Sequence, residues 1–250
     1  MRLVAAAALL AVGTALASQP SAADPSACPK MVPDDAGSVE LCVRSLEGKA
    51  IERYDMKQFD LLIEACDQAI QLSPERDFCY LMRGIARLET GDPDGAIEDN
   101  TRVIALKPTS ETAFFNRGQA YSTKREPDRA IPDYDRAIEL NPKVASYYYN
   151  RGRAYDALEQ TERAIRDFDQ AILLAPNEAQ FRFRRARFYH EYGDLERAIQ
   201  DYDQAIALTP DFARAYLCRG EAYRTLGDEV RAKQDHDHAV ELDASLADPG

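Results

Sequence analysis

The chain repeats itself every 34 residues, and this period constrains its fold more than any single residue does. Six blocks follow one another in register over residues 43–76, 77–110, 111–144, 145–178, 179–212 and 213–246. One position of the block always holds a small residue: Ala50, Gly84, Gly118, Gly152, Ala186 and Gly220. A small residue at a fixed position lets two helices approach closely, so the period predicts stacked copies of one helical unit in place of a single globular core.

Each block carries signals for two helices separated by a tight turn. Gly91, Gly193 and Gly227 stand where a first helix would end in a left-handed residue, and an aspartate that can cap the second helix follows each of them: Asp92, Asp194 and Asp228. Proline closes five of the blocks: Pro74, Pro108, Pro142, Pro176 and Pro210. Pro93 and Pro127 suit the first turn of a second helix, whereas Pro132 lies deeper and predicts a bend.

The recurring positions of the fourth block are Tyr148, Gly152, Tyr155, Ala164, Phe168, Ala171 and Pro176. This pattern resembles the tetratricopeptide repeat family, whose 34-residue unit is a helix-turn-helix. The resemblance implies an all-α fold, a right-handed α-solenoid of six helix-turn-helix hairpins over residues 43–246. The first block matches poorly in its first helix. The chain also departs from the family by having arginine or lysine where leucine is usual: Lys49, Arg83, Arg117, Arg151, Arg185 and Arg219.

Pairs of aspartates two residues apart recur on the expected second helices, for example Asp167 and Asp169. Residues two apart on a helix point in different directions, so such a pair does not predict acid/base chemistry or a calcium site. We expect instead that one member meets the arginine of the following block, for example Asp133 with Arg151 or Asp167 with Arg185. An ionic ladder would then replace the missing leucines.

The two ends of the chain lie outside the repeats. Residues 1–17 combine Arg2, an apolar stretch and a small-residue cleavage signal, which predicts a bacterial export signal, with a second candidate cut after Ala23. The apolar stretch is too short for a comfortable membrane span. We therefore expect a mature chain without membrane insertion in the periplasm or the medium, with a loop over residues 18–42 and a tail over 247–250. Lipid attachment at Cys28 is a disfavoured alternative.

Five cysteines are compatible with an oxidising compartment. We predict disulfides between Cys28 and Cys42 and between Cys66 and Cys79, which leaves Cys218 free to link two copies of the chain into a homodimer. The alternative for Cys66 and Cys79 is that they are small buried apolar residues.

The chain offers little that points to catalysis. It has no phosphate-binding glycine loop, zinc spacing or nucleophile elbow, so we expect no catalytic residues, no metal and no cofactor. A formal net charge of −12 argues against nucleic acid and anionic membranes as partners. His236 and His238 are not four residues apart, and we interpret them as part of a polar end-cap.

The resemblance implies that the first helices line a concave groove that holds an extended segment of a partner protein. One column along this groove is apolar from the second to the sixth block: Leu81, Phe115, Tyr149, Phe183 and Leu217. Amide and guanidinium groups flank it: Asn116, Gln119, Asn150, Arg153, Arg184 and Arg187. The flanking arginines Arg153, Arg184 and Arg187 form a positive patch with Arg182, Arg185 and Arg214. Such a patch favours an acidic or carboxylate-terminated peptide as the partner.

Three other interpretations stay open at this point. The apolar column could pack against the next repeat, or its aromatic rings could stack glycan or peptidoglycan. The chain could also be a non-catalytic subunit of an envelope enzyme complex.

Overall fold

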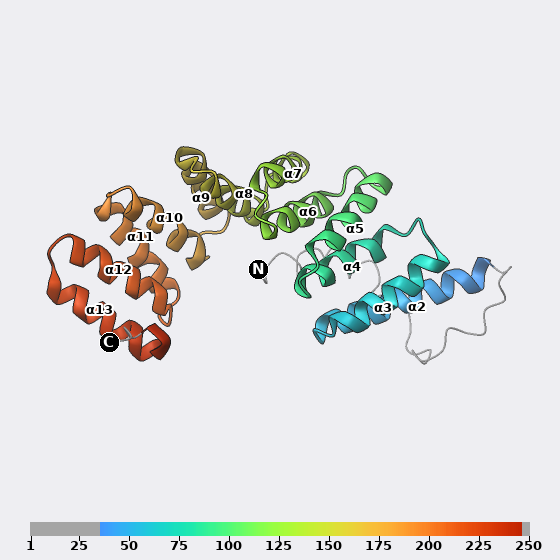
Figure 1. Ribbon diagram of the computed structural model, residues 1–250, viewed down its shortest axis with the longest axis horizontal. Helices are drawn as coiled ribbons and strands as arrows, with labels where there is room; N and C mark the ends of the chain where they lie inside the picture. Colours follow the sequence, from blue (N-terminus) through green and yellow to red (C-terminus); the bar gives the residue numbers. More distant parts are fainter. Residues whose placement is uncertain (1–35, 247–250) are drawn as a thin grey trace. The chain divides into compact units, whose positions relative to one another are not determined.

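The computed structural model describes residues 36–246, and all regular structure in this range is helical. The chain divides into two compact units at Pro142. Unit 1, here residues 36–142, contains α2 (Ala36–Asp55), α3 (Phe59–Leu72), α4 (Asp77–Glu89), α5 (Pro93–Leu106), α6 (Glu111–Thr123) and α7 (Pro127–Leu140) (Figure 1). Unit 2, here residues 143–246, contains α8 (Ala145–Ala157), α9 (Thr161–Leu174), α10 (Ala179–Glu191), α11 (Leu195–Leu208), α12 (Ala213–Thr225), α13 (Glu229–Leu242) and the short 3₁₀ helix η1 (Ala244–Leu246).

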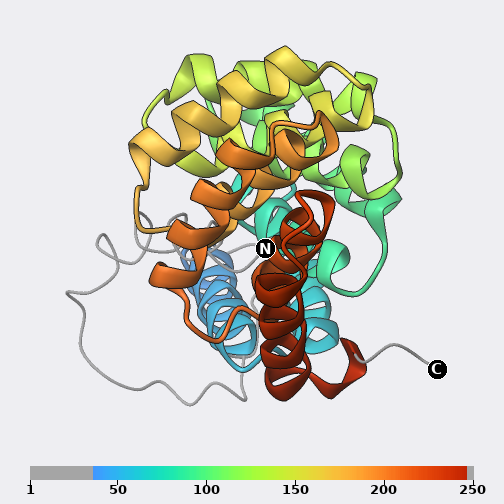
Figure 2. The ribbon, with the colours of Figure 1, turned by 90° about the vertical axis from the view of Figure 1, so that its left-hand side faces the viewer.

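Consecutive helices pair into hairpins, and the hairpins of each unit stack on their neighbours. The strongest packing joins the two helices of one hairpin, as in α12 with α13, and weaker packing joins adjacent hairpins, as in α11 with α12. Figures 1 and 2 show α12 and α13 running beside each other in opposite directions. The fold is therefore the predicted all-α solenoid of hairpins.

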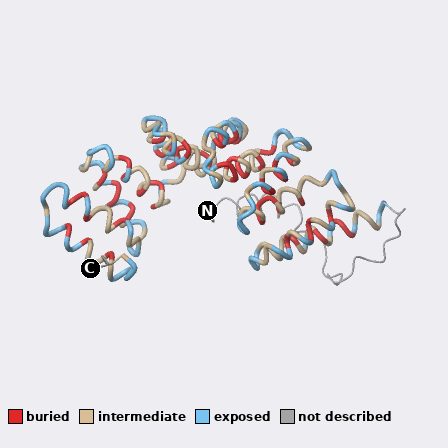
Figure 3. Tube along the Cα trace, viewed as in Figure 1, coloured by how far each residue is buried: buried red, intermediate tan, exposed pale blue. Residues whose placement is uncertain are grey.

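The small residue of each block lies where the two helices of a hairpin cross. In the third hairpin, a Cβ atom added to Gly118 would lie 2.7 Å from Cε1 of Tyr134 on the facing helix. Because glycine has no side chain, the fully buried ring of Tyr134 can pack against the backbone of α6. Buried residues lie on the facing sides of the paired helices in both units (Figure 3).

The predicted turn chemistry is confirmed in the second, fifth and sixth hairpins. Gly91, Gly193 and Gly227 have φ values of 84°, 77° and 81°. The aspartate after each glycine accepts a hydrogen bond from a backbone N–H of the following helix, as Asp92 does from Gly95 at 2.9 Å. The left-handed residue ends one helix, and the carboxylate caps the next.

The first, third and fourth hairpins reach the same turn without that chemistry. Lys57, Arg125 and Glu159 take the left-handed position at φ values near 60°, although they carry a Cβ atom. The residues that follow them, Gln58, Glu126 and Gln160, make no side-chain cap. Half of the hairpins therefore have a strained and uncapped turn.

Proline behaves as expected at the start of two helices. Pro93 and Pro127 are the first residues of α5 and α7. Pro132 lies inside α7, which continues on both sides of it, and the predicted bend stays a prediction.

The first hairpin begins earlier than the sequence indicated. We expected a loop up to residue 42, but α2 starts at Ala36. The longer helix places Cys42 and Val43 in the core beside α3 and α4, where both are fully buried. Burial of these side chains explains why residues 36–42 are helical. The predicted signal peptide, Cys28 and the tail lie outside the described residues.

Candidate interaction surface

The apolar column of the first helices is not an exposed aromatic track. Phe115 is fully buried, with its ring centroid 5.8 Å from that of Tyr134. Phe183 is also buried, 5.9 Å from Tyr202 and 4.8 Å from Phe212. The prediction that these two rings contact a partner is wrong, because the small residue three positions later lets the ring of the facing helix approach and cover them.

The other members of the column are partly buried and also take part in packing. The ring of Tyr149 lies 5.9 Å from Phe168 and 4.7 Å from Phe181. Leu81 packs against the core of the first hairpins, and Leu217 is half-buried. Most of the apolar column therefore packs within the stack of hairpins, which was the alternative to an exposed groove.

The predicted amide groups do not form a row that is open to a partner. Asn116 is only 5 % exposed. Asn150 donates a hydrogen bond from its Nδ2 atom to the carbonyl oxygen of Ser146 at 2.8 Å, within its own helix. Gln119 is half-buried. Asn116 is therefore corrected from a groove residue to a buried one.

In unit 2 the structure brings together three of the predicted arginines. Arg153 on α8 and Arg184 and Arg187 on α10 all lie close enough to the carboxylate of Asp156 to act on it electrostatically. Burial raises the pKa of Asp156, Glu191 raises it further, and the three guanidinium groups offset part of this increase. We call these three arginines, with Asp156 and Glu191, the arginine cluster.

The members of the arginine cluster differ in what they can still bind. Arg187 donates from Nη2 to Oε1 of Glu191 at 2.9 Å. Arg153 is exposed and lies over the Tyr149 ring, 5.9 Å from its centroid. The Nε atom of Arg184 is buried and has no hydrogen-bond partner among the described residues. Donors of the exposed Arg153 therefore remain available for a carboxylate, whereas the buried Nε of Arg184 contributes positive charge without being open to a partner.

Asp156 and Glu191 were not predicted as part of this surface, although a signal was present. Asp156 follows Arg153 by three residues and Glu191 follows Arg187 by four, which are the spacings of neighbours on a helix face. Two other predicted members of the positive patch are occupied elsewhere. Arg182 donates to Gln204 Oε1 at 2.7 Å, and Arg185 belongs to an ionic ladder.

That ladder runs through the hairpins of both units. In every hairpin from the second to the sixth, an arginine of the first helix donates from Nε and Nη2 to both oxygens of an aspartate 16 residues later. The aspartates are buried, and the pairs are Arg83–Asp99, Arg117–Asp133, Arg151–Asp167, Arg185–Asp201 and Arg219–Asp235. These two-point contacts join the helices of one hairpin.

The third nitrogen of the arginine reaches back to the preceding hairpin. Arg185 Nη1 donates to Asp169 Oδ1 at 2.5 Å, and Arg219 Nη1 makes the same contact with Asp203. These contacts confirm that one aspartate of a pair meets the arginine of the following block. The aspartates named as examples were wrong, because the first aspartate of each pair faces its own hairpin. Asp167 therefore bonds Arg151 in place of Arg185, and Asp133 bonds Arg117 in place of Arg151.

The cysteine predictions need one correction. Cys66 on α3 and Cys79 on α4 are fully buried free thiols, so the predicted disulfide between them is wrong and they serve as small core residues. A hydrogen bond between the two thiols, together with burial, raises the pKa of Cys66. The pairing of Cys28 with Cys42 stays a prediction, since Cys28 lies outside the described residues.

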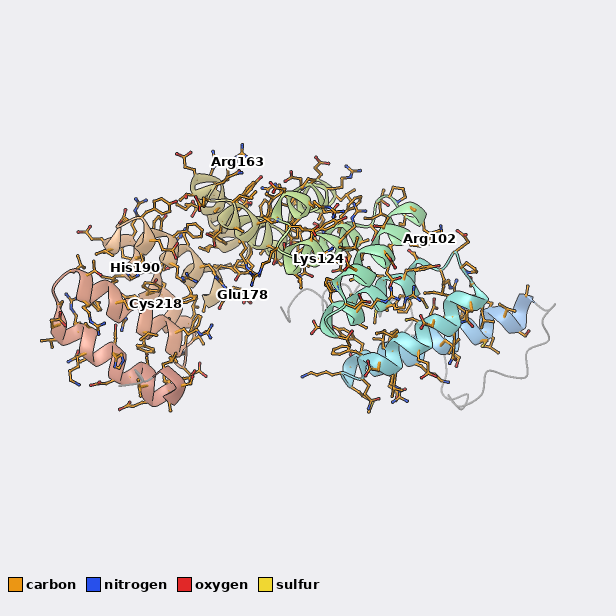
Figure 4. The ribbon with its side chains drawn as sticks, viewed as in Figure 1. Arg102, Lys124, Arg163, Glu178, His190 and Cys218 are labelled. Carbon is orange, nitrogen blue, oxygen red and sulfur yellow. The ribbon has the colours of Figure 1, made fainter. Side chains whose placement is uncertain are left out.

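Cys218 on α12 is half-buried (Figure 4). Burial raises its pKa to about 11, so the thiol is protonated at neutral pH. The homodimer through Cys218 stays a prediction, and this protonation slows the thiol exchange that it needs.

Residues 36–246 hold no cluster of three side chains suited to binding a metal ion. His238 at the last helix stacks edge-on with Tyr216 at a centroid distance of 4.5 Å. Within the same residues, every helix is too short or too polar to cross a bilayer.

Comparisons with known proteins agree with this architecture. The tetratricopeptide repeat model matches residues 112–144 and 145–178, and a second TPR repeat model matches residues 186–227. None of the curated protein sequences matches the chain.

Similar folds occur among solved structures. That of MamA is 27 % identical, with a TM-score of 0.61, and the match covers 66 % of this chain and 96 % of MamA. PilF of Pseudomonas aeruginosa is 14 % identical, with a TM-score of 0.72 and coverage of 82 % and 94 %. YrrB, described as a TPR protein with an unusual peptide-binding site, is 21 % identical, with a TM-score of 0.60 and coverage of 74 % and 96 %. With its 34-residue hairpins and these matches, the chain belongs to the tetratricopeptide repeat family.

Proposed function

We propose that this chain is a non-catalytic protein–protein interaction scaffold, and that unit 2 binds an extended, carboxylate-bearing segment of a partner protein at the arginine cluster. The observation that carries the proposal is the convergence of Arg153, Arg184 and Arg187 from two first helices in a chain with a net charge of −12. Local positive charge in an acidic protein attracts carboxylates and sets the orientation of the segment that carries them.

The state of each arginine supports a carboxylate as the bound group. Arg153 is exposed and has no ion pair among residues 36–246, so its donors can reach a partner, and Arg184 adds its positive charge beside it. Arg187 is held by Glu191, whose carboxylate a partner could displace. Arg214 on α12 is exposed and extends the positive surface beyond the cluster. Arginine binds a carboxylate through two parallel hydrogen bonds, which gives both affinity and geometry.

The proposal includes an exported location in the bacterial cell envelope, which rests on the predicted signal over residues 1–17. A glycan-binding role loses its main support, because Phe115 and Phe183 are buried and cannot stack on sugars. Peptide binding does not need these rings, since guanidinium groups supply the contacts.

The test uses the full mature chain and two fluorescent 12-residue peptides, one rich in glutamate and one with glutamine at the same positions. We expect the glutamate peptide to bind more tightly and its binding to weaken as salt is added. Replacing Arg153 and Arg187 with alanine should weaken binding at least tenfold, whereas Arg166→Ala, at an exposed arginine on α9, should leave it unchanged.

Two results would contradict the proposal. One is equal affinity for the glutamate and glutamine peptides. The other is an unchanged affinity in the variant with alanine at both Arg153 and Arg187, together with a loss of binding in Arg166→Ala. If the peptide results agree with the proposal, a photo-reactive residue at position 153, crosslinked in living cells, would identify the natural partner.

A further inference from the structure

In the fifth and sixth hairpins, the turns between the two helices expose apolar side chains that the helix ends do not need. Tyr192 follows α10 and is 63 % exposed, and Leu226 follows α12 and is 52 % exposed. In unit 1 the same position of the second and third hairpins holds Thr90 and Lys124. All four residues close their helix through the same backbone N–H bond to the carbonyl four residues earlier. The helix end therefore does not require an apolar residue.

Tyr192 and Leu226 border a shallow hollow between the turns of the fifth and sixth hairpins. The hollow measures about 450 Å³ and is lined by Tyr192, Gly193, Asp194, Leu195, Glu196 and Leu226. The hydroxyl of Tyr192 is hydrogen-bonded to that of Thr161 in the preceding hairpin, which fixes the direction of the ring. An apolar surface held in one orientation costs less entropy when a partner covers it.

The residues that line the hollow include two acidic side chains, Asp194 and Glu196, and no basic one. Glu196 lines it, and Glu229 begins α13 three residues after Leu226. Neither carboxylate has an ion pair among residues 36–246, whereas the capping residues Asp194 and Asp228 are bound to Arg197 and Arg231. A partner that fills the hollow would find the carboxylate of Glu196 without a cation.

We propose that this hollow is a second docking surface, for a protein segment that presents one leucine-sized or aromatic side chain next to lysine or arginine. The apolar side chain would cover Tyr192, Leu195 and Leu226, and the basic group would pair with Glu196. This surface has the opposite charge preference to the arginine cluster, so unit 2 offers one surface for acidic segments and another for basic ones.

The test measures binding of the full mature chain to a 12-residue peptide in which a central leucine is flanked by lysines, with a matched peptide that has glutamates in their place. We expect only the lysine peptide to bind, and we expect its amide chemical-shift changes to centre on residues 192–196 and 226–230. Tyr192→Ser combined with Leu226→Ser should weaken binding at least tenfold. Both residues are exposed, so circular dichroism should show an unchanged fold.

Two controls separate this surface from others. Leu173→Ser removes a leucine on α9 that is 73 % exposed, and it should leave binding unchanged. Alanine at both Arg153 and Arg187 should also leave it unchanged, which distinguishes this surface from the arginine cluster. Equal binding of the two peptides, no binding of the lysine peptide, or shifts elsewhere would overturn the proposal. Self-association of the wild type that Leu226→Ser abolishes would assign the hollow to a second copy of the chain and also overturn it.

Discussion

Arg117 differs from three other ladder arginines in its link to the preceding hairpin. Arg83, Arg185 and Arg219 reach back to an aspartate, but Arg117 Nη1 donates to the hydroxyl of Thr101 at 3.1 Å. A hydroxyl is a weaker acceptor than a carboxylate for a guanidinium group. The junction between the second and third hairpins therefore lacks one ionic contact.

We predict that Thr101→Asp stabilises the protein by about 0.5–1 kcal/mol, because it completes the ladder at a partly exposed site. Threonine and aspartate have similar helix propensities, so the helix itself contributes little. Urea unfolding would measure the change, and Thr101→Asn is the control that keeps a neutral acceptor. The ladder would lose this role if the aspartate and asparagine variants were equally stable.

Asp228 gives a second prediction at the scale of one residue. Hydrogen bonds from the backbone N–H and the side chain of Arg231 lower the pKa of Asp228 below its ordinary value of 3.8. A carboxylate with a lowered pKa in the folded state stabilises the protein above its unfolded pKa, and this stability is lost as the pH falls through the lowered value.

Asp228→Asn should therefore reduce the loss of stability on acidification below about pH 4, while keeping the helix cap at neutral pH. Thermal unfolding between pH 6 and pH 2.5 would measure this. An unchanged pH profile would show that the carboxylate of Asp228 does not contribute to acid sensitivity.

At the scale of helices and turns, the sequence predicted what depends on near neighbours in the chain. The turn at Gly91 and the cap at Asp92 need only local backbone geometry, so their spacing was enough to place them. The burial of Phe115 depends on the ring of Tyr134 in the facing helix. A small rotation of α6 decides whether Phe115 faces solvent or that ring, and the resemblance to the family did not fix this rotation.

The same reason explains why the wrong aspartate of each pair was named for the ladder. Asp167 and Asp169 are two residues apart, so they point to different sides of α9, and the sequence showed that only one could meet Arg185. The packing angle between adjacent hairpins selects Asp169, and no local signal contains that angle. Tyr192 and Leu226 could have been noticed, since apolar residues beside a turn glycine recur there with the 34-residue period.

The fourth hairpin offers a prediction about a whole turn. Glu159 occupies the left-handed position with φ of 58°, and Gln160 makes no cap. Replacing them with glycine and aspartate, as in the fifth hairpin, should stabilise the protein by about 1–2 kcal/mol through relief of strain and a new cap. Differential scanning calorimetry would detect a higher Tm. The reverse change, Gly193→Ala with Asp194→Ala, should lower the Tm by a similar amount.

At the scale of the whole molecule, each hairpin depends mainly on its neighbours. The principal contacts of α12 and α13 are with each other, with α10 and α11, and with η1. The stability of such an array is close to a sum of hairpin and interface terms, so damage to one end should remain local. The arginine cluster lies on α8 and α10 and the hollow reaches α12, so the two proposed surfaces should respond differently to the loss of the last hairpin.

Gly220→Val tests this independence. A Cβ atom at position 220 would lie 3.0 Å from the carbonyl oxygen of Ala232 and 3.2 Å from Cβ of Asp235, so α12 and α13 would have to separate. Hydrogen exchange should show lost protection in α12 and α13 and unchanged protection in α4, α5 and α6. Glu221→Val, at an exposed neighbour on the same helix, is the control. If protection fell equally in every hairpin, the chain would unfold as one cooperative body, and neither proposed surface could be altered without affecting the other.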